Sequence, residues 1–372
     1  MVNLDSNSFV GLDYEPNVSH RSYQTVLTEL EQFQPDIIHV DEPERLFVGF
    51  WRVAGVDYAK KRNIPCVSFF RTNFLDYLED YFPLPKPIFL AIKFLLKRLI
   101  VWVYNSYDLT LVTSKVTYPK VRDLGINNAQ DTSLVGFDSD RFKLYSPQTD
   151  FFQSHYGLKQ VDDLVKIVFL GRLYPDKGWN FTLEAFKTIS QKIDLTKVSL
   201  IVVGDGPMRQ EIKDKLGQIA PNLHLLGRVS PENIPPLLAN CDLHVTTSEK
   251  ETRGLTILEA FAAGIPVVAP NSGGVIENIQ DGSNGFLYTP GDVLDFMHKL
   301  QQLVENSTLR EQMGDRARNS IQAYSWEQAI QNLVNVWQEA ISQYGKQDVT
   351  VRGEASTLAK ARHARISLRI WY

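Results

Sequence analysis

The sequence predicts an α/β protein made of two doubly wound domains, each a parallel sheet flanked by helices. The first observation is length, because 372 residues exceed the usual size of a single domain. The second is a regular alternation of short apolar runs with helix-like segments through residues 165–345. The third is that these apolar runs are unbroken, which is typical of strands covered by helices on both faces. An apolar share of 44% is ordinary for a globular chain.

Composition excludes several classes of function. A formal net charge of −4 gives no electrostatic case for a nucleic-acid partner. The two cysteines, Cys66 and Cys241, have no metal-ligand spacing, and they favour a reducing, cytoplasmic location. The opening residues show no basic segment followed by an apolar run, so no signal peptide is expected. The apolar stretch 88–103 is interrupted by three cations and is not expected to span a membrane.

The second half of the chain supplies most of the predicted elements. Strands are expected at Val165–Leu170, Ser199–Val203, Leu223–Leu226, Leu243–Thr246 and Pro266–Ala269. Helices are expected at Trp179–Ile189, from Met208, and at Pro231–Ala239, Leu255–Ala263, Val275–Ile279, Val293–Val304, Leu309–Ala323 and Glu327–Gln343, with a turn at Gly282–Phe286. In open parallel sheets, ligands bind outside the carboxyl ends of the strands.

The first half follows the same pattern with fewer units. Strands are expected at Asp36–Val40, Pro65–Phe70, Leu109–Thr113 and Ser133–Phe137, and helices at Phe47–Lys61 and Pro87–Tyr104. A complete doubly wound domain usually carries five or six strands, and Met1–His20 shows no strand-like run. We therefore expect an N-terminal domain at 1–150 without its first strand–helix units. A second domain is expected at 164–345, and a basic C-terminal tail at 346–372.

The segment GRLYPDKG places two cations, Arg172 and Lys177, between a strand that ends at Gly171 and a helix. Backbone N–H groups at a helix N-terminus attract anions, and an arginine can hold a diphosphate through two hydrogen bonds. The alternative is a solvated basic loop. The segment VVGDGP follows the next strand, and its glycines, Gly204 and Gly206, allow a close backbone approach. Its alternative is an ordinary tight turn.

The segment SEKETRGLTILEA holds two glutamates eight positions apart. Glu251 lies in the loop after a strand, and Gly254 opens a helix. Glu259 lies inside an otherwise apolar run, where an unpaired charge is costly. Hydroxyl groups of a ligand would satisfy both carboxylates. The alternative is a helix glutamate paired with a neighbouring arginine or backbone N–H.

Taken together, GRLYPDKG, VVGDGP, LLGRV, SEKETRGLTILEA, PVVAPNSGG and DGSNGFLYTPGD resemble the C-terminal domain of family 4 retaining glycosyltransferases, which have the GT-B fold. The resemblance covers about 165–340. It extends to lipid glycosyltransferases such as sulfoquinovosyltransferases and phosphatidylinositol mannosyltransferases. It implies a hexosyltransferase that takes a nucleotide diphosphate sugar as donor, without a cofactor or metal.

The resemblance also implies a role for each matching residue. Arg172 and Lys177 would hold the donor diphosphate, Glu251 the transferred sugar and Glu259 the ribose. Further donor-binding residues would be Gly171, Gly204, Gly206, Arg228, Thr252, Gly254 and Leu255. In the N-terminal half, PDIIHVDEP and PCVSFFRTNF resemble segments beside the acceptor and the sugar, which implies roles for Glu42, Arg71 and Asn73. Arg71 stands where the family often has histidine, and an ordinary ion pair is its alternative.

Residues 86–103 hold Lys86, Lys93, Lys97 and Arg98 among large apolar groups. A basic amphipathic helix of this kind can lie on an anionic membrane surface, at the inner face of a membrane. The alternative is a helix whose apolar face packs on the sheet.

The sequence thus predicts a retaining glycosyltransferase that forms an α-glycosidic bond to a lipid or glycan acceptor. Two other functions stay open. One is a non-catalytic nucleotide-sugar-binding remnant, and the other is a GT-B-type nucleotide-sugar epimerase.

Overall fold

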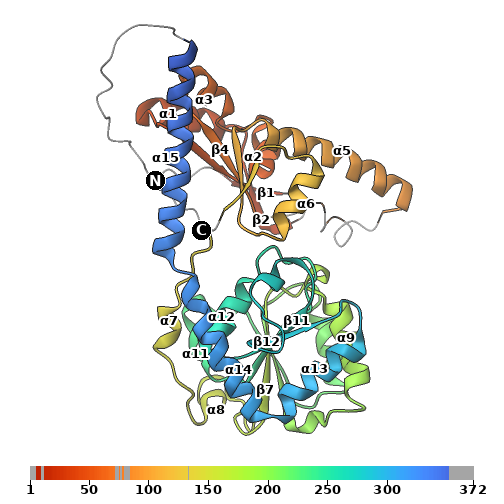
Figure 1. Cartoon of the computed structure of the whole chain (residues 1–372). Coiled ribbons are helices and arrows are strands. Elements are labelled where there is room, and N and C mark those ends of the chain that lie inside the picture. Colours follow the sequence, from red (N-terminus) through yellow and green to blue (C-terminus); the bar gives the residue numbers. More distant parts are fainter. Residues whose placement is uncertain are drawn as a thin grey trace. The chain divides into compact units, whose positions relative to one another are not determined.

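The computed structural model describes residues 6–9, 12–71, 75, 78, 84–132 and 134–351. They form two compact units (Figure 1). Unit 1 contains the described residues up to Leu134 together with Ala329–Val351, and unit 2 contains Val135–Gln328. The sequence placed 135–150 in the first domain and 329–345 in the second, so these segments lie in the other unit from the one expected.

Unit 2 is built on a six-stranded sheet in the order β12-β11-β10-β7-β8-β9, and every neighbouring pair is parallel. Its strands are β7 (Val165–Leu170), β8 (Val198–Val203), β9 (Leu223–Gly227), β10 (Leu243–Val245), β11 (Val267–Pro270) and β12 (Gly285–Tyr288). The sequence missed β12 and predicted a turn there. Gly285 pairs with Val267, and a Cβ on Gly285 would lie 2.5 Å from the carbonyl oxygen of Val267. The glycine is therefore needed inside a strand rather than in a turn.

Helices cover both faces of this sheet. They are α7 (Asp140–Lys143), α8 (Phe151–Tyr156), α9 (Trp179–Ile189), α10 (Arg209–Gly217), α11 (Ile234–Ala239), α12 (Leu255–Ala263), α13 (Val293–Glu305) and α14 (Ser307–Ser320). Alternate residues of β8 serve two cores: Leu200 and Val202 pack with α9, α10 and α13, whereas Ile201 and Val203 pack with α8, α11 and α12. This double burial explains the unbroken apolar strand sequences.

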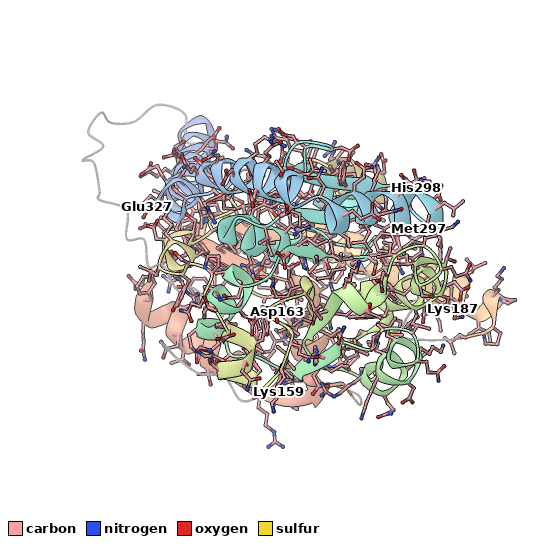
Figure 2. The ribbon with its side chains drawn as sticks, turned by 90° about the horizontal axis from the view of Figure 1, so that it is seen from below. Lys159, Asp163, Lys187, Met297, His298 and Glu327 are labelled. Atoms are coloured by element: carbon pink, nitrogen blue, oxygen red, sulfur yellow. The ribbon has the colours of Figure 1, made fainter. Side chains whose placement is uncertain are left out.

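Met297 and His298 are neighbours on α13, and both are labelled in Figure 2. Met297 is buried in the core, while its neighbour His298 is exposed. The segment predicted as a helix near Val275–Ile279 is the 3-10 helix η4 (Gly273–Glu277). The predicted bounds of α9 and α12 are confirmed.

Unit 1 contains a four-stranded parallel sheet in the order β3-β4-β5-β6. Its strands are β3 (Ile38–Asp41), β4 (Cys66–Phe70), β5 (Leu109–Val112) and β6 (Ala129–Asp131). The fourth strand was predicted at Ser133–Phe137, but residues 134–137 form no strand. The actual strand, AQD, lies at the sheet edge and is partly exposed, so it carries no apolar run.

Residues near the start of the chain form two strands that the sequence analysis did not expect. They are β1 (Ser6–Phe9) and β2 (Leu12–Val18), which pair antiparallel as a separate two-stranded sheet. The helices of unit 1 are α1 (Ser22–Phe33), α2 (Pro43–Phe50), α3 (Val56–Arg62), α5 (Lys86–Asn105), α6 (Thr117–Leu124) and, from Ala329 onward, α15 (Trp326–Val351). Helix α1 was not predicted from the sequence.

The single helix predicted over Phe47–Lys61 is wrong, because the chain forms α2 and α3 there. Trp51 and Gly55 between them are left-handed, with φ of 55° and 79°. A Cβ on Gly55 would lie 2.8 Å from Ile38, so the sheet requires a glycine at this break. The helix predicted at Pro87–Tyr104 is confirmed as α5. Among the described residues, no helix combines the length and the apolar character needed to cross a membrane.

Candidate functional site

Two backbone hydrogen bonds join the loops that follow β7 and β8. The N–H of Gly171 donates to the carbonyl oxygen of Val203 (3.0 Å), and the N–H of Leu173 donates to that of Asp205 (3.0 Å). A Cβ on Gly204, whose φ is 137°, would lie 1.8 Å from the carbonyl oxygen of Gly171. The glycine is therefore required by the contact between two loops, which is a stricter demand than a tight turn makes.

In the loop after β7, both predicted cations contact one buried carboxylate. Asp176 has no exposed side-chain surface, and its Oδ2 lies 3.3 Å from Nη2 of Arg172 and 3.8 Å from Nζ of Lys177. The Arg172 guanidinium also stacks over the Tyr174 ring, 5.1 Å from its centroid. Asp176 was not predicted, although an acid between two cations is a visible signal. It holds both cations in place at the sheet edge.

Two hydroxyl groups fasten this loop to the loop after β10. The Thr247 hydroxyl donates to the carbonyl oxygen of Lys177 (3.2 Å), and the Ser248 hydroxyl donates to that of Asp176 (3.2 Å). Gly178 is left-handed, and a Cβ there would lie 2.0 Å from the carbonyl oxygen of Thr247. The two loops therefore meet through backbone atoms, without room for a side chain.

This contact brings together the residues predicted to bind the diphosphate and the sugar. Nζ of Lys177 lies 2.5 Å from Oε1 of Glu251, and both side chains are about one-fifth exposed. The carbonyl oxygen of Glu251 accepts a hydrogen bond from the N–H of Gly274 (2.7 Å). A Cβ on Gly274 would lie 2.0 Å from the carbonyl oxygen of Thr252, so the loop after β11 closes on the same segment. The loops that follow β7, β10 and β11 thus converge on one ion pair.

The same segment leads into the N-terminus of α12. Gly254 precedes the helix with a φ of 69°, the left-handed conformation that favours glycine. The N–H groups of Thr252, Gly254 and Leu255 donate to no carbonyl oxygen of the residues that the structure describes. Unpaired N–H groups at a helix N-terminus form a site for anions such as phosphate.

Glu259 lies further along α12, among buried apolar neighbours. Its carboxylate makes no hydrogen bond or ion pair with any residue in the described part of the chain. Burial raises the pKa of Glu259 to about 7, and the more distant Arg141 offsets this only in part. The alternative of a glutamate satisfied by a neighbouring arginine or N–H is therefore not what the structure shows. The carboxylate is unpaired and close to its titration point.

Arg253 was not predicted, and it anchors the loop that carries Glu251. Its guanidinium pairs with Glu277 and lies over the Tyr324 ring, 5.2 Å from the centroid. Its carbonyl oxygen accepts a hydrogen bond from the side-chain amide of Asn278 (2.8 Å). These contacts tie Arg253 to η4 and to Tyr324.

Two further predicted residues lie at the same edge of unit 2. Gly206 approaches the neighbouring loop so closely that a Cβ would lie 2.5 Å from the carbonyl oxygen of Leu173. Arg228 follows β9, is exposed, and pairs with no acid among the described residues. A free cation next to the Gly204 loop is consistent with an anionic ligand.

The residues predicted in the N-terminal half lie in unit 1. Glu42 is left-handed (φ 45°) and pairs with Arg45 at 2.9 Å. Arg71 follows β4, and its Nε lies 3.0 Å from Oδ2 of Asp41 at the end of β3. Asn73 lies outside the described residues.

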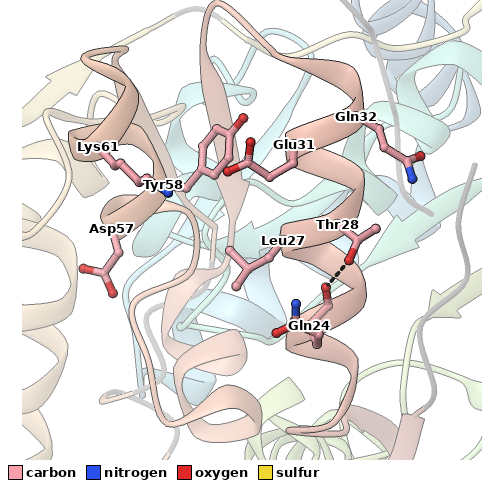
Figure 3. A pocket seen from close by; sticks show the side chains of 8 residues that line it. All are labelled: Gln24, Leu27, Thr28, Glu31, Gln32, Asp57, Tyr58 and Lys61. Carbon is pink, nitrogen blue, oxygen red and sulfur yellow. Dashed lines mark hydrogen bonds between the residues drawn. The ribbon is translucent and has the colours of Figure 1, made fainter.

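A separate hollow of about 480 Å³ lies between α1 and α3 of unit 1 (Figure 3). It is lined by Gln24, Leu27, Thr28, Glu31, Gln32, Asp57, Tyr58 and Lys61. None of these is a predicted site residue, and the hydrogen bond drawn between Thr28 and Gln24 (3.0 Å) belongs to the helix surface. The candidate site is therefore the strand edge of unit 2.

Comparison with known proteins finds relatives among glycosyltransferases. Residues 153–320 match the family described as glycosyl transferases group 1. The chain is 30% identical over 344 residues to a sulfoquinovosyl transferase of Arabidopsis thaliana, covering 90% of this chain and 63% of the plant protein's length. It is 27% identical to a GDP-mannose-dependent alpha-mannosyltransferase of Corynebacterium glutamicum, covering 90% of this chain and 75% of that one.

Solved structures share the architecture. HepE of Anabaena, crystallised with UDP and glucose, superposes with a TM-score of 0.65 at 22% identity over 85% of this chain and 80% of its own. Sucrose-phosphate synthase of Thermosynechococcus elongatus superposes with a TM-score of 0.69 at 17% identity over 92% and 86%. The predicted GT-B fold class is thereby confirmed. The chain carries a glycosyltransferase group 1 domain at residues 153–320.

Proposed function

We propose that this protein is a retaining glycosyltransferase of the family 4 type. It moves a hexose from a nucleotide diphosphate sugar to an acceptor and forms an α-glycosidic bond. The observation that supports this most is the 2.5 Å pair between Lys177 and Glu251, held by the buried Asp176 beside the N–H groups that open α12. The relatives named as sulfoquinovosyl and mannosyl transferases support the same reaction class.

In this proposal the ion pair is the resting state of the donor site. Arg172 and Lys177 bind the diphosphate, and the free N–H groups before α12 add hydrogen-bond donors to it. Glu251, released from Lys177 as the cation turns to the phosphate, accepts hydrogen bonds from hydroxyls of the transferred sugar. The unpaired Glu259 accepts hydrogen bonds from the ribose. Each charge that is unsatisfied or shared in the free protein gains a ligand partner.

The protein itself supplies positive charge where the leaving diphosphate gains negative charge. Arg172 stacks on Tyr174 and forms an ion pair with Asp176, so its position is set before the donor binds. Preorganised charge of this kind stabilises a transition state without reorganisation. We therefore propose that turnover needs no divalent metal or cofactor, and expect full activity in excess EDTA. A rate restored only by added Mg²⁺ or Mn²⁺ would refute this part.

The decisive experiment pairs binding with turnover. We expect one or more of the UDP-, GDP- and ADP-hexoses to stabilise the protein in a thermal-shift assay, since a ligand at 100 times its Kd adds about 2.7 kcal/mol. Glu251→Gln should keep the nucleoside diphosphate shift and lose sugar transfer. A shift without transfer to any acceptor would favour a binding remnant, and an epimerised sugar without transfer would favour an epimerase. No shift with any donor would refute the proposal.

The acceptor is proposed to be a lipid or glycan, reached at the inner face of a membrane from the cytoplasm. Helix α5 supports the lipid acceptor, because it leaves large apolar side chains exposed, with Leu90 at 63% and Leu95 at 65%. Lys93 and Arg98 lie on the same helix, with their cations over the rings of Phe89 and Phe94. Exposed apolar groups interleaved with cations suit the surface of an anionic bilayer.

This contact is tested by flotation with vesicles. Wild-type protein should float with phosphatidylglycerol vesicles at low salt. With phosphatidylcholine vesicles it should remain in the bottom fraction of the gradient. The double variant Leu90→Gln, Leu95→Gln should lose flotation, whereas Leu294→Gln, an exposed leucine on α13, should behave as wild type. No flotation of wild type at low salt would refute membrane contact and leave the donor chemistry untouched.

A further inference from the structure

One face of the unit 1 sheet carries a polar cluster near the carboxyl ends of β3 and β4. His39 and Asp41 are two residues apart on β3, so their side chains share a face. Asp41 pairs in register with Phe69 on β4, and Arg71 follows β4 directly. Trp337 of α15 covers the same face, with its ring 5.5 Å from that of His39. Side chains from two strands and the last described helix thus meet at the ligand-binding edge of a parallel sheet.

The tautomer of His39 is fixed by its neighbour. Nε1–H of Trp337 donates to Nδ1 of His39 at 3.0 Å. An imidazole nitrogen that accepts a hydrogen bond carries no proton, so the proton of the neutral ring is on Nε2. Burial and the nearby Arg71 lower the pKa of His39 to about 4, which keeps the ring neutral near pH 7. Its Nε2–H finds no acceptor among the residues that the structure describes. The cluster therefore holds one unused donor.

Asp41 supplies an unused acceptor in the same cluster. Its Oδ2 pairs with Nε of Arg71 at 3.0 Å, while its Oδ1 is buried and accepts no hydrogen bond from the side chains and backbone that the structure describes. The N–H of Glu42 donates to the carbonyl oxygen of Phe69 (3.3 Å). Burial raises the pKa of Asp41 to about 6, and the Arg71 cation and the backbone N–H of Glu42 offset this only in part. Arg71 is half exposed and stacks over the Phe69 ring, 5.1 Å from its centroid. A buried carboxylate oxygen without a donor is costly, and it points to a ligand that completes the site.

We propose that His39, Asp41 and Arg71 form a subsite for adjacent hydroxyl groups of a sugar or cyclitol ring on the acceptor. A hydroxyl donates one hydrogen bond and accepts others, so one such group can serve Asp41 Oδ1 and another His39 Nε2–H. A bare anion would leave the carboxylate unpaired, and an acyl chain would leave both groups unpaired. Trp337 is a positioning residue, because it acts only by holding the His39 ring. This inference rests on the proposed function and extends it to the acceptor.

The test separates acceptor recognition from donor binding. Asp41→Asn should raise the acceptor KM about tenfold or more, since a buried polar group is then mismatched. Trp337→Phe keeps an aromatic ring but loses the N–H, and should raise the same KM several-fold with a smaller effect on kcat. Both variants should keep the wild-type affinity for nucleoside diphosphate. Asp57→Asn, on the exposed surface of α3, is the matched control and should change neither quantity.

A second measurement does not depend on turnover. In nitrogen-15 NMR spectra of histidine-labelled protein, His39 should show the Nε2–H tautomer. In Trp337→Phe, which lacks the N–H donor, His39 should no longer be held in this single tautomer. Titration with myo-inositol or methyl glucoside, and separately with vesicles containing phosphatidylinositol, should shift the Nε2 signal. A shift with the soluble compounds assigns a free acceptor, and one with vesicles alone assigns a lipid headgroup.

Two outcomes would overturn the inference. One is an acceptor KM within twofold of wild type in folded Asp41→Asn and Trp337→Phe. The other is a His39 signal that no hydroxylated compound moves. If no donor is turned over, the proposed function fails, while the NMR titration still decides whether the subsite exists.

Discussion

Replacing Glu259 with glutamine should make the free protein more stable while it removes donor binding. The half-buried carboxylate has no partner among the described residues, and desolvation by burial raises its pKa from 4.5 to about 7. The unfolded chain loses this proton near pH 4.5, whereas the folded protein keeps it until about pH 7. Because the folded state binds more protons between these values, wild-type stability must fall as the pH rises through this window.

The pKa difference sets the magnitude. A shift of one pKa unit corresponds to 1.36 kcal/mol, so the raised pKa of Glu259 lowers the stability of the folded state by about 3 kcal/mol at pH 8 and about 1 kcal/mol at pH 5. Glutamine does not titrate, and any cost of burying its amide is the same at both pH values. The stability of Glu259→Gln relative to wild type should therefore grow by about 2 kcal/mol between pH 5 and pH 8.

Urea unfolding at the two pH values measures this difference, with the midpoint of the unit 2 transition as the readout. Glu311→Gln, at an exposed position of α14, is the matched control and should follow wild type at both pH values. Calorimetric titration with the donor nucleotide should show lost affinity in Glu259→Gln alone. A stability difference that is the same at pH 5 and pH 8 would refute the unpaired buried carboxylate.

Three further outcomes are expected. Lys177→Met should weaken nucleoside diphosphate binding about 10- to 100-fold by calorimetry, because it removes a charged hydrogen bond, and a change below twofold would contradict the assigned role. Gly204→Ala should lower the free energy of unfolding in urea by more than about 3 kcal/mol, since its Cβ would meet a carbonyl oxygen at 1.8 Å. The control Gly157→Ala should lower it by only about 1–2 kcal/mol, because that Cβ would enter open space and only the left-handed backbone is strained. Tyr104→Phe leaves the buried carboxyl of Glu44, whose pKa burial already raises to about 7, without its hydroxyl donor. Its cost in urea unfolding, about 1–3 kcal/mol, should be larger at pH 8 than at pH 5.

The sequence predicted unit 2 well because its strands are buried on both faces and its loops carry glycine. The bounds of α9 and α12 follow from apolar spacing that ends at glycines. The sequence also predicted that Lys177 and Glu251 lie at the carboxyl ends of strands in one sheet, and in the structure they form an ion pair. The position of Asp176 between two cations is visible in the sequence, but its complete burial beneath them is not, and for this reason its role was missed.

Unit 1 was predicted less well, for two physical reasons. Its edge strand β6 is polar and short, so it lacks the apolar run that marks a buried strand. The contact between Trp337 and His39 joins residues far apart in the chain, and only the folded structure brings them together. The site residues predicted there, Glu42 and Arg71, stay predictions, and Asp41 joins them through its buried oxygen.

The division of the chain into units has a consequence for synthesis. The described residues of unit 2 form one continuous stretch, 135–328, whereas unit 1 needs residues from both sides of that stretch. Domains fold as units while the chain emerges from the ribosome, N-terminal residues first. The sheet of unit 1 is made first, yet the helix that covers His39 is made last. Unit 1 must therefore wait, with that face uncovered, while the whole of unit 2 is translated. A ribosome that stalls before Trp337 would leave a folded unit 2 attached to an unfinished unit 1.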